Sequence, residues 1–289
     1  MAPTANPLIL DFDRSVLPLP GSESIELGRW QEAIRFGCPL GQLRALGDLL
    51  APALARQPGV VFMGSGDYHH ITCLLLQRYR ALGRPLHVVV FDNHPDNMRY
   101  PWGIHCGSWV WHASRLPFVA QIDVLGITST DVERAHGWEN HLRNLKSGRV
   151  RYWSVGCDLG WMRWLGITHS RSFASVSELA DAFGEALAVR TEPVYLSVDK
   201  DVLSAEDAHT NWDQGVMRLS EMQLVIGSLK DRVVGADVTG EVSVYRYDSR
   251  FKRMLSGLDG QPDIAQADLQ RWQAEHRAVN LAILHALAQ

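Results

Sequence analysis

Apolar segments of strand length alternate with segments of helical periodicity along most of this chain. The strand-like segments are Gly59–Asp67, Pro85–Asp92, Val119–Ile127, Arg149–Val155, Pro193–Asp199 and Arg232–Glu241. Helical spacing of apolar residues follows the first of them and recurs in Ser175–Ala188, in Leu219–Lys230 and after Pro262, with Ser175 and Ser220 as expected helix caps. Consecutive parallel strands need crossover connections, which are usually helical. The alternation therefore predicts a three-layer α/β/α fold with a mostly parallel, doubly wound sheet, as one domain over residues 1–289.

The composition is that of a soluble globular protein and gives no sign of a nucleic-acid or membrane partner. The chain has 289 residues, of which 46% are hydrophobic and 21% charged, and its net charge is -4. Binding to nucleic acid or to a membrane surface usually needs a basic face, and no apolar run approaches the roughly 20 residues that span a bilayer. We find no signal-peptide pattern. Four scattered cysteines without a Cys-x-x-Cys pair indicate free thiols, so we expect a cytoplasmic protein.

Three of the expected strands end in acidic residues and histidines. The segment "VVFDNHPDN" is the clearest case, because its polar residues occupy every second position after an apolar run. The three groups are, in chain order, Asp67, His69 and His70; Asp92, His94 and Asp96; and Asp199 and Asp201. Ligands of open parallel sheets bind beyond the carboxyl ends of the strands. We therefore expect these side chains to converge.

Converging carboxylates repel one another and cannot all stay ionised unless a cation lies among them. Oxygen-rich ligand sets with one or two imidazoles suit divalent metals such as Mn²⁺, and so many carboxylates suggest two metals about 3.5–4 Å apart. Each motif alone is also compatible with a solvated turn. That interpretation is preferred for Asp11 and Asp13, since no histidine follows them. The joint occurrence of the other three motifs favours a metal site.

In these motifs the chain resembles the arginase/agmatinase (ureohydrolase) family. "DNHPD" (Asp92–Asp96) matches the Asp-x-His-x-Asp element of that family without a gap, and "SVDKD" (Ser197–Asp201) matches its Ser-x-Asp-x-Asp element. "GSGDYHH" (Gly64–His70) is similar to its Gly-Gly-Asp-His element. The resemblance covers roughly Val60 to Glu241 and implies an arginase-like fold.

The resemblance also implies two Mn²⁺ ions, with Ni²⁺, Co²⁺ or Zn²⁺ as alternatives. It assigns six protein ligands: His69 and Asp96 to one ion, His94 and Asp201 to the other, and Asp92 and Asp199 to both. In the family the first histidine follows the aspartate directly, whereas here Tyr68 stands between them. His70 is therefore the alternative to His69.

The chemistry that the resemblance implies is attack of a hydroxide, held between the two metals, on the planar carbon of a guanidino or amidino group. His105 in "GIHCGSW" is similar to the proton-shuttle histidine of the family, although Cys106 is inserted before the glycine. A loop histidine without a catalytic part is the alternative. Glu241 resembles the glutamate that binds the guanidinium, one residue further along than usual, and a strand-end acid is the alternative there.

The residues that would read the substrate differ from those of arginases. Arg99 and Trp102 lie in "NMRYPWG", and Arg99 is expected either to pair with a substrate carboxylate or to form a salt bridge at the rim. Asp131 stands where the family has an aspartate that can meet a substrate amine. Trp212 and Asp213 are further candidates to line the pocket, although packing is the commoner use of Trp. We expect a small guanidino or amidino substrate other than L-arginine.

Two further function classes stay open on the sequence. One is a non-catalytic relative that binds a ligand, and the other is a one-metal, zinc-type deacetylase on a related fold. The surplus of acidic residues argues against the second. The resemblance also implies a homo-oligomer, because oligomers are common in the family.

Overall fold

The computed structural model describes residues 6–250, 252–254 and 264–288. Among these residues nine strands form one sheet in the order β2-β1-β4-β11-β10-β5-β7-β8-β9, and every neighbouring pair is parallel. The strands are β1 (Leu8–Asp11), β2 (Glu23–Glu26), β4 (Val60–Phe62), β5 (Leu86–Phe91), β7 (Val119–Ile127), β8 (Val150–Val155), β9 (Arg171–Phe173), β10 (Val194–Asp199) and β11 (Val233–Thr239). A separate antiparallel pair is formed by β3 (Gly37–Cys38) and β6 (Ile104–His105).

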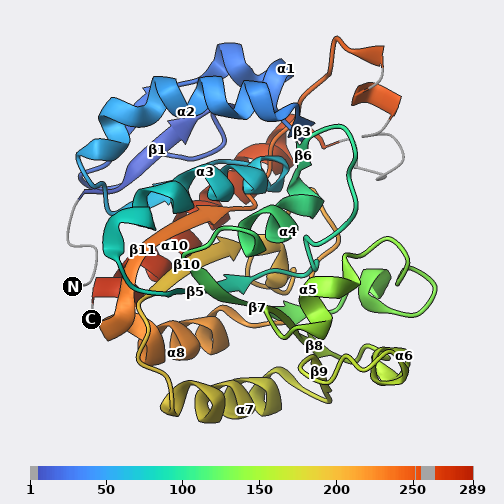
Figure 1. The fold of residues 1–289 in the computed structure, drawn as a ribbon. Helices are drawn as coiled ribbons and strands as arrows, with labels where there is room; N and C mark the ends of the chain where they lie inside the picture. The colour runs from blue at the N-terminus through green and yellow to red at the C-terminus, as the bar shows by residue number, and fades with distance from the viewer. Residues whose placement is uncertain (1–5, 251, 255–263, 289) are drawn as a thin grey trace.

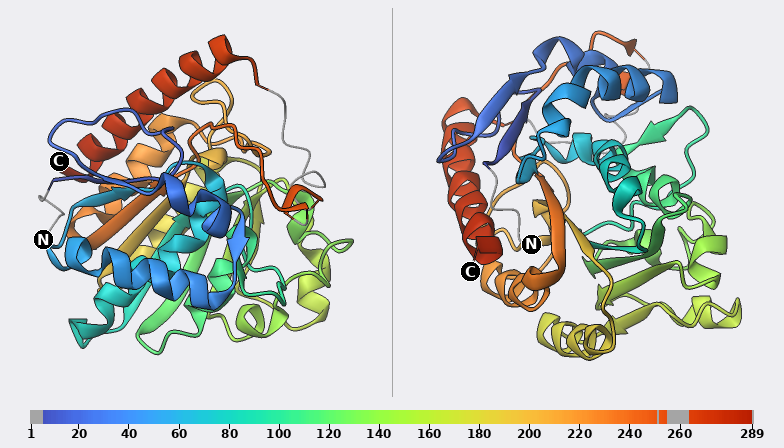
Figure 2. Two further views of the ribbon diagram at one scale, coloured as in Figure 1. Left: turned by 90° about the horizontal axis from the view of Figure 1, so that it is seen from above. Right: turned by 60° about the vertical axis from the view of Figure 1, so that its left-hand side comes forward.

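Helices cover both faces of the sheet (Figure 1). One face carries α1 (Gln31–Ile34), α2 (Leu40–Ala55), α3 (Thr72–Leu76), α4 (Trp109–Ser114), α5 (Leu142–Lys146) and α6 (Gly160–Trp164). The other face carries α7 (Val176–Ala188), α8 (Leu219–Leu229) and α10 (Gln266–Ala288). The two views of Figure 2 show these layers with the sheet between them. The predicted three-layer α/β/α fold with a parallel, doubly wound sheet is confirmed.

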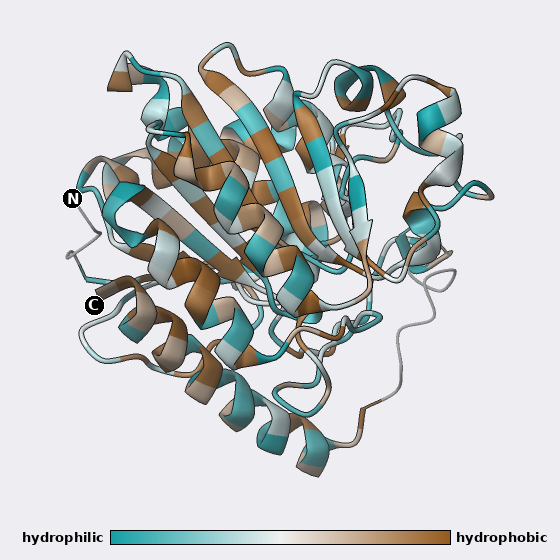
Figure 3. Ribbon diagram, turned by 90° about the horizontal axis from the view of Figure 1, so that it is seen from below, coloured by the Kyte–Doolittle hydropathy of each residue, from teal (hydrophilic) through white to brown (hydrophobic). Residues whose placement is uncertain are grey.

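Strand β5 shows why the central strands read as mostly apolar runs. Val88 and Val90 pack in the core on the α2–α4 side, whereas Val89 and Phe91 pack in the core beneath α7 and α8. All four are fully buried. Since successive side chains of a strand point to opposite faces, a strand covered on both faces is apolar at most positions. The covering helices carry both hydrophilic and hydrophobic residues (Figure 3), as amphipathic helices on a sheet do.

The main predicted elements are confirmed with small shifts at their ends. Of the two predicted helix caps, one is confirmed and one is wrong. Ser175 caps α7, since its side chain accepts a hydrogen bond from the Glu178 backbone N–H. The prediction that Ser220 caps α8 is wrong, because the helix begins one residue earlier at Leu219. At that end the Glu221 carboxylate accepts from the Arg218 backbone N–H at 2.8 Å.

The segment Gly59–Asp67 forms a strand that leads into a glycine-rich segment, as predicted. β4 stops at Phe62, and the polar residues after it form the 3₁₀ helix η2 (Gly66–Ile71). The outer strands β2 and β9 carry mostly exposed side chains, so they lack the apolar runs that reveal the central strands. Within the described segments, no helix has an apolar stretch long enough to cross a bilayer.

Candidate metal centre and active-site cavity

The ends of the neighbouring strands β5 and β10 bring Asp92 and Asp199 to the same edge of the sheet. The two strands pair in parallel with Val198 opposite Phe91, and the next residue on each is one of these aspartates. From β5 the chain moves outward through β7, β8 and β9, and it returns to β10 on the other side of β5. Such a reversal of strand order is a switch point, where open parallel sheets bind their ligands.

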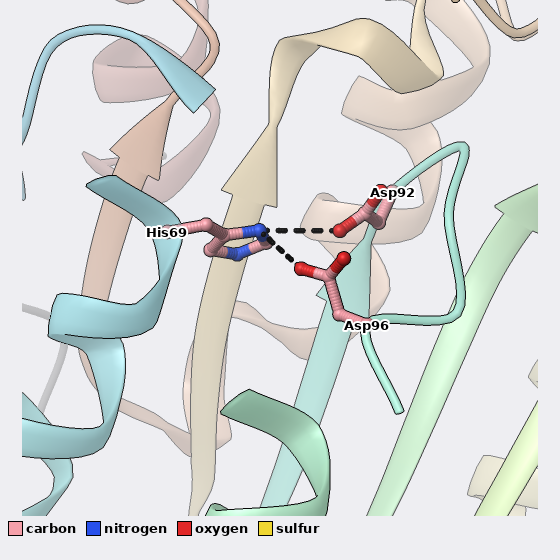
Figure 4. A group of neighbouring side chains, drawn as sticks. All are labelled: His69, Asp92 and Asp96. Carbon is pink, nitrogen blue, oxygen red and sulfur yellow. Dashed lines mark ion pairs between the residues drawn. The ribbon is translucent and has the colours of Figure 1, made fainter. Parts of the chain in front are cut away.

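The helix η2 brings His69 to these carboxylates. Its Nδ1 atom lies 2.9 Å from Asp96 Oδ2, 3.2 Å from Asp92 Oδ2 and 3.5 Å from Asp199 Oδ2. Figure 4 shows the imidazole pointing at Asp92 and Asp96 from the opposite side of the cluster. The close approach depends on Gly66, because a Cβ atom there would lie 3.0 Å from Asp199 Oδ2.

Hydrogen bonds behind His69 set its orientation. Its Nε2 atom lies 3.0 Å from Ser197 Oγ, and that hydroxyl donates to Asp237 Oδ1 at 2.7 Å. Because the hydroxyl proton is used on Asp237, the Ser197 oxygen accepts from Nε2–H of His69. The Nδ1 lone pair then faces the acidic cluster, as it does in a metal-ligating histidine held by a partner on its far side.

The structure does not bring His70 to the same cluster. His70 is fully buried, and neither ring nitrogen has a well-aligned hydrogen bond within the described part of the chain. It belongs to neither group of residues that could hold a metal ion, whereas His69 belongs to one. Of the two alternatives in "DYHH", His69 is the one whose geometry suits a ligand.

A second group forms around His94. Its Nδ1 atom lies 2.9 Å from Asp201 Oδ2 and 3.7 Å from Asp92 Oδ1. The Asn93 backbone N–H donates to Asp201 Oδ1 at 3.0 Å, which fixes the second carboxylate oxygen. The groups His69–Asp92–Asp96 and Asp92–His94–Asp201 therefore share Asp92.

The atoms of these groups fit divalent cations. His69 Nδ1 and Asp92 Oδ2 lie at ion-pair distance from each other, yet neither has a well-aligned hydrogen bond among the described residues. Buried polar atoms are seldom left in that state. Two ligands that each lie about 2.1 Å from one octahedral cation are about 3 Å apart, which is close to the shorter N···O separations here. The set of imidazole nitrogens and carboxylate oxygens is one that Mn²⁺ accepts.

Burial and mutual repulsion dominate the electrostatics of the cluster. Burial, together with the charge of Asp92, raises the pKa of Asp96 to about 8. Burial and the neighbouring carboxylates also raise the pKa values of Asp199 and Asp201. For Asp92 burial acts in the same direction, but its interactions with the neighbouring His69 and His94 outweigh burial and hold its pKa below the usual range.

Both histidines respond to the same acids. Burial works to lower their pKa values, but Asp92 and Asp96 beside His69, and Asp201 and Asp92 beside His94, raise them well above the ordinary value. Without a cation the cluster therefore retains protons that a metal would displace.

A cavity of about 560 Å³ opens onto both groups. Its lining includes most of the site residues expected from the sequence: Asp92, His94, Asp96, Arg99, Trp102, His105, Asp131, Asp199, Asp201 and Trp212. His69 lies behind the carboxylates and is 1% exposed. Residues that lie far apart in the sequence thus meet at one opening.

His105 lines this cavity from the strand β6. Its Nδ1 atom accepts a hydrogen bond from the Gly107 backbone N–H at 2.9 Å, so Nε2 carries the proton of the neutral ring. Burial, followed by the charge of Lys252, lowers the pKa of His105 to about 3. The ring is therefore neutral at physiological pH.

Of the five residues expected to contact the substrate besides Glu241, four line the cavity and one does not. Trp102 is 58% exposed, and Arg99 and Asp131 line the cavity from its exposed and half-buried rim. Trp212 lies in the wall as expected. Asp213, by contrast, is exposed and does not line the cavity, and its backbone carbonyl accepts from the Asn93 side chain.

The expected place of Glu241 beside the substrate needs correction. Glu241 is 2% exposed and does not line the cavity. Its Oε1 atom accepts from Lys200 Nζ and from Asn280 Nδ2, each at 2.6 Å. Lys200 lies between two expected ligands in "DKD", and its side chain turns away from them into this buried pair. The sequence pattern did not reveal this ion pair. In it, Lys200 binds the carboxylate that was expected to bind the substrate.

Other residues of the cavity were not expected. Phe36 comes from the segment between α1 and β3, before the first motif, and its ring lines the wall. His136 and Glu139 also line the cavity and form an ion pair at 3.0 Å. The "HGWEN" sequence around this pair is only a weak indication of a functional site, and the sequence around Phe36 gives no such indication.

Comparisons with known proteins agree with this geometry. The model of the Arginase family matches residues 33–249. An uncharacterized protein of Thermotoga maritima is 28% identical over 231 residues, which are 79% of this chain and 68% of the relative.

Solved structures of low sequence identity share the fold. An arginase from Bacillus caldovelox superposes with a TM-score of 0.55 at 14% identity and covers 99% of this chain and 98% of its own. A formimidoylglutamase from Bacillus subtilis gives 0.56 at 13% identity, and a hypothetical agmatinase from Burkholderia thailandensis gives 0.53 at 17%. Each of these two covers 98% of this chain and 86% of its own. With the family model matching most of its length, the chain belongs to the arginase family.

Proposed function

We propose that this protein is a dinuclear-metal hydrolase of C–N bonds in a guanidino or amidino compound, which releases an amine together with urea or an amide. The observation that carries this proposal is the pair of ligand groups that share Asp92 on one cavity. Membership of the arginase family supports it.

The side chains suit two ions. His69 and Asp96 would hold one, and His94 and Asp201 would hold the other. Asp92 and Asp199 would hold both; Asp199 Oδ2 lies 3.5 Å from His69 Nδ1, and its Oδ1 accepts from the Asp201 backbone N–H. When bound, a pair of divalent ions supplies a water molecule that loses its proton near neutral pH. Mn²⁺ is our first choice, with Ni²⁺, Co²⁺ and Zn²⁺ as alternatives.

The rest of the cavity suits a cationic substrate. Asp131 adds negative charge to a lining that already contains the ligand carboxylates, whereas Glu139 is paired with His136. Such a cavity attracts a guanidinium or amidinium, whose N–H edges bond strongly to carboxylates. Arg99 at the rim would meet a carboxylate on the far end of a substrate.

His105 would serve as the proton shuttle. Its Nδ1 accepts from the Gly107 backbone N–H, so Nε2 is the ring nitrogen left to exchange a proton with the substrate. As a shuttle, the ring would take up the proton released when the attacking water ionises and then pass a proton to the nitrogen that leaves the tetrahedral carbon. We also propose that the protein is cytoplasmic and forms a homo-oligomer.

The competing functions make different demands on the same residues. A one-metal deacetylase-like site would use an Asp–His–Asp set such as that around His94. In such a site His69 and Asp96 would bind no metal, although they lie in contact. A non-catalytic relative would bind its ligand without turnover. The shared Asp92 favours two metals over one, and turnover separates the enzyme from the non-catalytic relative.

Product analysis tests the proposed function. The Mn²⁺-loaded protein is incubated with a panel of guanidino and amidino compounds, and released urea, amide and amine are measured by NMR. We expect turnover of at least one compound by the wild type and by Asp231→Asn, whose exposed carboxylate lies before β11, and none by Asp92→Asn. If the wild type holds two metals and turns over no compound of the panel, the hydrolase proposal fails.

A further inference from the structure

Two aromatic rings form the cavity wall between the ligand groups and His105. The rings of Phe36 and Trp212 are within 10° of parallel, and their centroids lie 6.3 Å apart. Trp212 also lies next to His94, with ring centroids 6.1 Å apart. On the other side, Phe36 meets the His105 ring edge-on at 4.3 Å. The two rings therefore link the His94 group to His105 within the lining of the cavity.

The backbone holds Phe36 in an unusual conformation. Its φ angle is +69°, in the left-handed region that favours glycine. Its N–H donates to the Asp67 carbonyl at 2.9 Å, and its carbonyl accepts from the Cys106 N–H at 3.0 Å. A large aromatic residue at such an angle, with its ring in the cavity wall, points to a use for the side chain itself.

Trp212 is seated against the acidic cluster by the absence of a side chain at Gly66. A Cβ atom on Gly66 would lie 3.2 Å from Trp212 Cδ1 and 3.0 Å from Asp199 Oδ2. The indole of Trp212 and the carboxylate of Asp199 therefore both lie close to the backbone of Gly66. A flat group beside the carboxylates would present its edge to them and its face to the rings.

Guanidinium and amidinium groups have two kinds of surface. Their N–H edges are strong hydrogen-bond donors, whereas their faces are weakly hydrated and bind aromatic rings. Resting on the function proposed above, we propose that Phe36 and Trp212 are specificity-determining residues that bind the face of a flat guanidinium or amidinium head. They select this planar cation over a neutral ureido or amide group of the same shape.

Calorimetry with a small probe tests this role separately from turnover. Methylguanidinium chloride is titrated into the Mn²⁺-loaded wild type, Phe36→Leu and Trp212→Leu, with N-methylurea as the neutral isostere and NaCl as the ionic control. We expect the wild type to prefer methylguanidinium. Each leucine variant should bind it about 3- to 30-fold more weakly, with metal content unchanged and N-methylurea binding little altered.

Matched variants separate the rings from general packing. Phe36→Tyr and Trp212→Phe keep an aromatic face and should stay within about threefold of the wild type, as should Trp164→Leu, which removes a tryptophan that is 92% exposed. Equal binding of methylguanidinium and N-methylurea by the wild type, or undiminished binding by Trp212→Leu, overturns the proposal. If Phe36→Leu does not fold, Trp212→Leu alone decides, since Trp212 is only half-buried.

The outcomes also separate this inference from the proposed function. Aromatic-dependent binding of methylguanidinium without turnover of any compound would leave the inference standing and contradict the hydrolase. Turnover with a KM that does not change in either leucine variant would support the hydrolase and contradict the role of the two rings.

Discussion

Asp92 contributes one carboxylate oxygen to each of two groups of prospective metal ligands. Asp92→Asn replaces one charged oxygen with an amide and removes the shared ligand, so both ions should bind more weakly. We expect turnover to fall by at least about a hundredfold, because even partners behind the ligands contribute 10- to 100-fold. Metal analysis and steady-state kinetics check this, with Asp231→Asn as the control. Full activity in Asp92→Asn would exclude the dinuclear assignment.

His105 lies on the cavity but in neither ligand group. His105→Asn removes the ring while keeping a polar side chain, and we expect turnover to drop about 10²- to 10⁴-fold, the usual contribution of a positioned acid or base. The metal content should stay at the wild-type value. Loss of metal along with activity would show that His105 is a ligand rather than a proton shuttle.

At the residue scale the sequence predicted the acidic cluster better than its surroundings. Asp92, His94 and Asp96 follow directly from strand β5, so their convergence could be read from spacing alone. The choice between His69 and His70 depends on how η2 turns after β4, which no local pattern specifies. Phe36 reaches the cavity from a part of the chain before all three motifs. Glu241 was misplaced because its partner Lys200 is 41 residues away in the sequence.

Among the elements, the C-terminal helix α10 is held to the segment after β10 by hydrogen bonding. Lys200 Nζ donates to Asn280 Oδ1 of this helix at 3.0 Å as well as to Glu241. Burial lowers the pKa of Lys200 against the opposing effect of Glu241, and burial raises the pKa of Glu241. The pair therefore has to be complete to be tolerated in the interior.

Removing one partner should destabilise the fold. Glu241→Leu leaves the Lys200 ammonium buried and unpaired, and we expect the free energy of unfolding to fall by about 3–5 kcal/mol. The double variant Lys200→Met with Glu241→Leu removes both charges and should recover much of that loss. Denaturant unfolding followed by circular dichroism measures both. Wild-type stability in the single variant would contradict this account of the pair.

The central elements could be predicted because burial on both faces makes their sequences mostly apolar. β5 and β10 were placed nearly to the residue for this reason. The 3₁₀ helix η2 after β4 was not predicted, since its glycine and polar residues suit a turn equally well. Edge strands such as β2 carry exposed side chains and leave no such pattern.

For the molecule as a whole, metal binding should be linked to proton release. In the metal-free protein, the pKa values of His69 and His94 are raised, and that of Asp96 is raised to about 8. Groups with raised pKa values hold their protons below that pH, so a metal must displace them there. Affinity for Mn²⁺ should therefore rise as the pH increases from 6 through 8. Calorimetry in two buffers of different ionisation enthalpy would detect the released protons, and a pH-independent affinity would contradict the prediction.

The central claim concerns the number of metal ions that one chain holds. The direct measurement is mass spectrometry of the metals in protein that has been loaded with Mn²⁺ and desalted, for the wild type and for Asp231→Asn as control. The geometry around Asp92 predicts about two metals per chain in both proteins. One metal per chain, zinc above all, would contradict the dinuclear centre and favour a deacetylase-like site, and none would favour a binding protein without catalysis.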